Sequence, residues 1–372
     1  MENLFRVAEL FVEKVKQDYP QDVAIIGYYG SYADGSQREK SDLDIFFIPN
    51  TEKGRGLGHS FIIEDVGIDL FPISWKRAEN IAAFNEVIVS VIADSKVLYA
   101  ASEEDLARFD ALREKINLFS KEENRKVAIN KALEVFNRVC KSLYYLEELK
   151  YSKDITAERV EAFNIVTTVS ETVALLNQSY LKKGWGKNLE QILTFEKKPK
   201  GFKDLIDAII RETCSETMVD YCKTLVENTK ELLIEEEEIL STNEISFNGF
   251  NGYYEEMKSY FNKIIRACDE EDYPTVFFAT VNLQKEVASF LLEAQGICRF
   301  DSLNTYRTYQ DVMIQYGLPN LIEICYPNNY DEIKEGVCRF ESAFVELLIK
   351  NGLKVNRFNN VEDYGLHLRE NY

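Results

Sequence analysis

The stretch that decides the fold runs from Gly30 to Asp44 and reads GSYADGSQREKSDLD. It separates two apolar segments, VAIIGYY (Val23–Tyr29) and IFFIP (Ile45–Pro49), whose β-branched and aromatic residues predict strands. The Gly-Ser pair closes the first strand, and Asp42 and Asp44 stand at the start of the second. Residues two positions apart on a strand point to the same face, so we expect both carboxylates on one side of a sheet.

The residues around this stretch predict a small domain that mixes strands and helices. Apolar positions recur at helical spacing over residues 3–17, which indicates an opening helix. Further along, the pattern predicts a hairpin with strands at Phe61–Glu64 and Ile68–Ile73, and a short strand at Lys96–Ala100. The domain is expected to close near residue 115.

The remainder of the chain has helical patterns. Long periodic stretches cover residues 123–150 and 156–183, and further helices are expected at about 203–211 and 216–240. The Asn-, Ser- and Gly-rich loop at 241–252 is the best second boundary. The prediction is an α+β protein: an N-terminal domain with a small mixed sheet flanked by helices (1–115), a helical bundle (116–245) and an additional helical domain (246–372).

Composition narrows the function. The 372 residues carry a net charge of −19 and are 45% hydrophobic, which is enough for real cores. This charge disfavours nucleic-acid partners and favours cations, although many proteins are acidic merely for solubility. Seven scattered cysteines and two histidines argue against a disulfide framework or a zinc site. Neither a signal sequence nor a long apolar run is present, so we expect a cytoplasmic protein that does not enter membranes.

The carboxylates suggest phosphate chemistry. Mg²⁺ prefers carboxylate oxygens, and two such ions can bridge a triphosphate and an attacking oxygen. Asp69, in the apolar run GIDLFPI, is the candidate third carboxylate beside Asp42 and Asp44. Simple strand-end charges and an ordinary turn at Gly30-Ser31 are the alternative interpretation.

The order Gly30-Ser31, Asp42-Leu43-Asp44, then Asp69 resembles the polymerase-β-like nucleotidyltransferase superfamily, and Ser41 before the aspartate pair fits the same pattern. The resemblance implies that Asp42, Asp44 and Asp69 hold two Mg²⁺ ions. It also implies that Gly30, Ser31 and Ser41 bind ATP or another nucleoside triphosphate.

The helical second part is similar to that of the kanamycin-type antibiotic nucleotidyltransferases, over roughly residues 125–240. In those enzymes a glutamate on the first bundle helix is the general base, and a lysine one turn later contacts the phosphates. Glu134 and Arg138 occupy these positions here, with arginine in place of lysine. A solvent-exposed salt bridge between them is the simpler interpretation, and Glu171 stays open as an alternative base.

These observations lead to a Mg²⁺-dependent transferase that moves AMP from ATP to a hydroxyl of a small cationic acceptor such as an aminoglycoside. The alternatives are a toxin-type enzyme that modifies a protein or tRNA, and a non-catalytic nucleotide-binding regulator. The kanamycin-type enzymes share each active site between two subunits, so a homodimer is compatible with the resemblance. The segment after residue 246 could instead supply those contacts within one chain.

Overall fold

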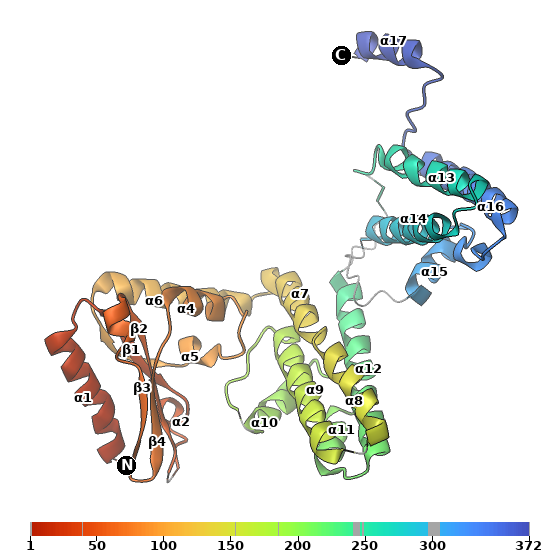
Figure 1. Ribbon diagram of the computed structural model, residues 1–372. Helices are drawn as coiled ribbons and strands as arrows, with labels where there is room; N and C mark the ends of the chain where they lie inside the picture. Colours follow the sequence, from red (N-terminus) through yellow and green to blue (C-terminus); the bar gives the residue numbers. More distant parts are fainter. Residues whose placement is uncertain are drawn as a thin grey trace. The chain divides into compact units, whose positions relative to one another are not determined.

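The computed structural model describes residues 2–38, 40–152, 154–184, 186–240, 246–247, 249–296 and 306–371. The chain divides into two compact units, residues 1–233 and residues 234–372. The expected α+β class is confirmed, because a five-stranded mixed sheet near the N-terminus is followed by helices (Figure 1). The three-domain division expected from the sequence is not tested by this split and stays a prediction.

The sheet has the strand order β3-β4-β2-β1-β5, in which β2 and β4 are parallel and the other neighbours are antiparallel. Its strands are β1 (Val23–Tyr29), β2 (Leu43–Pro49), β3 (His59–Ile63), β4 (Val66–Pro72) and β5 (Lys96–Ala100). The parallel pair places the start of β2 beside the middle of β4, with Leu43 opposite Ile68 and Asp44 opposite Asp69.

Helices cover both faces of the sheet. Phe11 of α1 (Glu2–Asp18) packs against Phe47 on one face, with ring centroids 5.4 Å apart. On the other face Phe46 stacks on Phe109 of α6 (Glu103–Phe119), at 6.0 Å. The remaining helices of this region are short: α2 (Ser31–Asp34), α3 (Glu52–Arg55), α4 (Trp75–Ala82) and α5 (Ser90–Ala93). Burial on both faces explains why β1 and β2 read as continuous apolar runs.

The helical part of the first unit is built on α9, which packs against α7 and α8. Its elements are the 3₁₀ turn η1 (Glu122–Asn124), α7 (Arg125–Phe136), α8 (Val139–Ser152), α9 (Ile155–Leu176), α10 (Lys187–Thr194), α11 (Phe202–Arg211) and α12 (Ser215–Leu240), which runs into the second unit.

The predicted extent of two long helical stretches differs from the structure. The stretch 123–150 is interrupted at Asn137 and Arg138, between α7 and α8. The stretch 156–183 ends at Leu176, and Gln178 has a φ of +50°, which no α-helix accommodates. Hydrophobic periodicity cannot locate such breaks, because the apolar positions continue across them.

The second unit has its own aromatic core. Its elements are α13 (Tyr253–Asp269), α14 (Tyr273–Ala294), α15 (Tyr306–Gln315), the 3₁₀ turn η2 (Ile322–Ile324), α16 (Tyr330–Lys350) and α17 (Val361–Asn371). Phe261, Phe290, Phe340 and Phe344 are fully buried in this core. Among the residues that the structure describes, no helix combines the length and apolar character needed to cross a membrane.

Candidate active site

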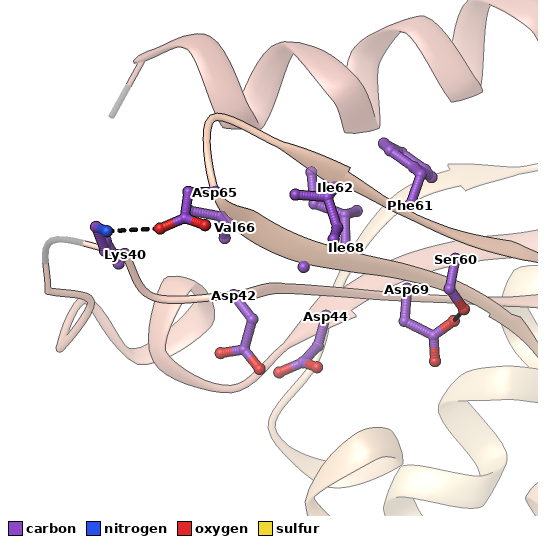
Figure 2. Close-up of a pocket in the computed structure, with 11 residues that line it drawn as sticks. Lys40, Asp42, Asp44, Ser60, Phe61, Ile62, Asp65, Val66, Ile68 and Asp69 are labelled. Atoms are coloured by element: carbon purple, nitrogen blue, oxygen red, sulfur yellow. Dashed lines mark hydrogen bonds and ion pairs between the residues drawn. The ribbon is translucent and has the colours of Figure 1, made fainter.

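Three aspartates lie together at one end of the sheet. Asp44 of β2 is the register partner of Asp69 on the parallel neighbour β4, and Asp42 directly precedes β2. All three line one open pocket of about 720 Å³, and Figure 2 shows their side chains extending to the same side of the two strands. The strand register therefore places Asp44 beside Asp69, and the ligand roles of the three aspartates stay predictions.

The electrostatics of this pocket are dominated by negative charge. Burial, followed by the charges of Asp42 and Asp69, raises the pKa of Asp44 to about 6. Ser60 of β3 donates a hydrogen bond of 2.7 Å to Asp69 and fixes that carboxylate. Within the described part of the chain, none of the three aspartates forms an ion pair with a lysine or arginine. The pocket thus holds negative charge that a cation would neutralise.

The donor set fits a hard divalent cation, because carboxylate oxygens are the ligands that Mg²⁺ prefers. The described residues contain no group of three or more His, Cys, Asp or Glu side chains already arranged to hold a metal ion. Binding would therefore require the carboxylates of Asp42, Asp44 and Asp69 to rotate toward one another from neighbouring backbone positions.

The Gly30-Ser31 turn lies against the carboxylate of Asp44. Gly30 has a φ of +72°, a conformation that favours glycine, and a Cβ at this position would meet Asp44 Oδ2 at 2.8 Å. Ser31 follows as the first residue of α2. Glycine is required here both by the backbone conformation and by the close approach of Asp44.

The other residues expected at the site lie outside this pocket. The Ser41 hydroxyl accepts a hydrogen bond of 2.8 Å from the backbone N–H of Arg38 and closes a turn. Glu134 is exposed on α7, whereas Arg138 lies after the end of that helix. Arg138 forms an ion pair of 3.5 Å with Glu171 of α9, so the salt bridge to Glu134 considered from the sequence is replaced by one to Glu171.

Glu171 faces the sheet domain. It lines a small cavity of about 10 Å³ together with Glu86 and Tyr180. Burial raises the pKa of Glu171, and the charge of Arg138 opposes this change. Glu86 in turn forms an ion pair of 3.0 Å with Arg77 of α4. Glu171, the alternative general base considered from the sequence, thus lies where the bundle packs against the sheet domain.

Two neighbours of the aspartates escaped the sequence analysis. Tyr29 is the register partner of Asp44 on β1, and its pKa is raised by burial and then by the charges of Asp44, Asp69 and Asp42. Ser60 reaches Asp69 only because β3 pairs with β4. The position of Tyr29 directly before Gly30 could have placed it near the aspartates, whereas no pattern in the sequence pointed to Ser60.

Comparisons of sequence and structure relate the chain to known proteins. Residues 8–162 match the family model of the nucleotidyltransferase domain, and residues 106–239 match that of the KNTase C-terminal domain. A putative protein adenylyltransferase from Methanocaldococcus jannaschii is 27% identical over 105 residues, covering 26% of this chain and 71% of the relative. A nucleotidyltransferase-like protein of known structure from Exiguobacterium sibiricum covers 64% of this chain and 76% of its own, with 11% identity and a TM-score of 0.38.

The two family matches overlap and together span residues 8–239, which include the sheet, the aspartates and the bundle. Residues 240–372 lie beyond both matched ranges. Residues 8–239 are therefore similar to the nucleotidyltransferase domain and to the KNTase C-terminal domain, and these matches support nucleotidyltransferase activity.

Proposed function

We propose that the enzyme transfers a nucleoside monophosphate, AMP from ATP, to a hydroxyl of a small cationic acceptor of the aminoglycoside type. The observation that carries the proposal is the set of three neighbouring aspartates without a cationic partner in the described residues. The acceptor class is supported by the net charge of −19, which attracts cations, and by the match to the KNTase C-terminal domain.

Asp42, Asp44 and Asp69 would hold two Mg²⁺ ions. Such ions neutralise the triphosphate and stabilise the charge that develops during phosphoryl transfer. Gly30 and Ser31 allow the backbone to approach the phosphates, and Ser41 and Arg138 are retained as further nucleotide-binding residues. The acceptor hydroxyl attacks the α-phosphorus in line, a carboxylate takes its proton, and pyrophosphate leaves.

The carboxylate that takes the proton lies on a bundle helix. Glu134 is the residue implied by the resemblance, but its side chain is exposed on α7. Glu171 fits the role better, because burial raises its pKa toward the range in which a carboxylate is an effective base. Its partner Arg138 orients the carboxylate group.

A protein hydroxyl is the second candidate acceptor. It is favoured by the relative from Methanocaldococcus jannaschii, whose name describes a putative protein adenylyltransferase. Both acceptors would use the same sheet domain. They are distinguished by the labelled product, which is a small molecule in one case and a protein in the other.

The test combines an acceptor panel with one pair of variants. Pyrophosphate release is measured with Mg²⁺, each nucleoside triphosphate and a set of amino-sugar acceptors, and labelled nucleotide is followed into small molecules and protein bands. Asp44→Asn should lower kcat by roughly a hundredfold or more, because it removes a ligand from the metal ions. It should leave the melting temperature intact, because it also removes charge repulsion.

Asp65→Asn is the matched control. Asp65 lines the same pocket but is exposed and ion-paired with Lys40 at 2.7 Å (Figure 2), away from the three aspartates. We expect this variant to keep wild-type activity. Equal activity of Asp44→Asn and wild type would remove the aspartates from the mechanism, and label in a protein band would favour the second acceptor.

A further inference from the structure

Residues 177–184, the first part of the connection between α9 and α10, contact the sheet domain, and we call them the strap. Gln178 Nε2 donates to the backbone carbonyls of Phe119 and Lys121, at 2.9 and 2.6 Å. The Tyr180 hydroxyl donates to Asp94 at 2.9 Å. These bonds link the strap to the end of α6 and to the end of α5.

The far end of the strap is held by α10. Gln191 donates to the Tyr180 carbonyl at 2.8 Å and accepts from the Lys182 backbone N–H at 3.0 Å. On the other side of Lys183, the Lys187 backbone N–H donates to the Gly184 carbonyl at 3.0 Å, so hydrogen bonds hold the backbone both before and after this lysine. The position of this lysine is set by the fold, even though its side chain is about half exposed.

Lys183 reaches the segment that follows the Gly30-Ser31 turn. Its Nζ lies 3.0 Å from Asp34 Oδ2 and 3.4 Å from Ser36 Oγ. Asp34 also accepts a hydrogen bond of 2.9 Å from the Ser36 backbone N–H, so the carboxylate stays in place without the lysine. The strap thus brings a cation to the segment that follows the turn assigned to the nucleotide by the proposed function.

We propose that Lys183 is a nucleotide-binding residue that exchanges Asp34 for the triphosphate when the nucleotide enters. Helix α2 has four residues and spans roughly 6 Å, which a lysine side chain can cover by changing rotamer. The exposed ion pair with Asp34 stabilises the protein little, so it is readily given up for a more highly charged phosphate.

This exchange makes Asp34 a competitor of the nucleotide. A carboxylate that holds Lys183 in the free enzyme weakens triphosphate binding, because the contact must break first. A purely structural ion pair would behave differently: loss of either partner would loosen the strap, and both losses would change nucleotide affinity in the same direction. The sign of the Asp34 effect therefore separates the two roles.

The inference rests on the proposed function and is tested by binding alone. The dissociation constant of the full-length protein for a non-hydrolysable ATP analogue is measured by calorimetry with Mg²⁺ and without acceptor. Lys183→Ala should raise this constant roughly tenfold, because a charge-assisted contact to phosphate is lost. Asp34→Asn should lower it, since the amide keeps the Ser36 contact but releases the lysine.

Lys182→Ala is the matched control, because Lys182 has the same charge and lies on the same exposed strap. It should change the constant by less than about twofold, as expected of a solvated surface charge. AMP affinity should be equal in wild type and Lys183→Ala, since the contact is made to the outer phosphates.

Two outcomes overturn the assignment of Lys183 while the wild type still binds the triphosphate. One is equal affinity of Lys183→Ala and Lys182→Ala, and the other is weaker binding by Asp34→Asn. A wild-type protein that binds no nucleoside triphosphate would instead overturn the proposed function, and the assignment with it.

Discussion

Asp44 lies on β2 between Tyr29 of β1 and Asp69 of β4, and Gly30 approaches its carboxylate from the turn. One side chain therefore responds to three neighbouring segments. Burial and the charges of Asp42 and Asp69 raise its pKa to about 6. A substitution at Gly30 should therefore change activity by displacing the Asp44 carboxylate.

Gly30→Ala tests this link between the turn and the carboxylate. The new Cβ would lie 2.8 Å from Asp44 Oδ2 and would strain a φ of +72°. We expect kcat/KM to fall by roughly tenfold or more and the free energy of unfolding to fall by about 1 kcal/mol. Turnover and chemical denaturation measure the two effects.

Gly35→Ala is its control. Gly35 has a φ of +76°, but a Cβ there would meet nothing within 4 Å. The backbone strain and the loss of stability should be similar, whereas activity should stay close to that of the wild type. If both variants lose activity equally, the effect of Gly30 comes from backbone strain and not from Asp44.

At the scale of elements, the strands were predictable and the junctions were not. The strands β1 and β2 were predicted directly from their apolar runs, the shared face of Asp42 and Asp44 from strand alternation, and Asp69 from its place in another apolar run. The break at Arg138 and the strap carrying Lys183 left no trace in periodicity, because both are set by contacts between distant segments. Lys183 meets Asp34 across 149 positions of sequence (183 − 34), which no local pattern encodes.

The break between α7 and α8 bears on the general base. Arg138, in this break, forms an ion pair with Glu171, the proposed general base. Glu171→Gln should lower kcat/KM by roughly a hundredfold, as expected when a general base is removed. A base must be deprotonated to act, and burial raises the pKa of Glu171. Wild-type activity should therefore decline on acidification at a higher pH than an exposed glutamate would cause, and the variant should lose this dependence.

Glu134→Gln, on the exposed face of α7, is the comparison. It should retain most of the activity across the same pH range, measured as kcat/KM with a fixed acceptor. Arg138→Gln removes the ion pair and a proposed nucleotide contact but keeps the base, so it should lower kcat less than Glu171→Gln. A larger loss in Glu134→Gln would return the base to α7, as the sequence resemblance implied.

At the scale of the whole molecule, the two family matches account for residues 8–239, and the second compact unit folds around a separate aromatic core. The net charge, in contrast, is a property of the entire chain. The excess of 63 acidic over 44 basic side chains gives −19, and this field acts on any charged substrate before contact. Residues far from the pocket therefore influence how fast each substrate arrives.

Opposite salt dependences follow for the two substrates. The Mg²⁺ complex of ATP is still anionic and is repelled, so its association rate should rise as salt is increased from about 20 to 200 mM and screens the repulsion. A cationic acceptor is attracted, and its association rate should fall over the same range. Stopped-flow binding measures both, with an uncharged nucleoside as the control that should show no trend. An ATP rate that decreases with salt would contradict this prediction, because nearby cations such as Lys183 would then outweigh the field of the chain.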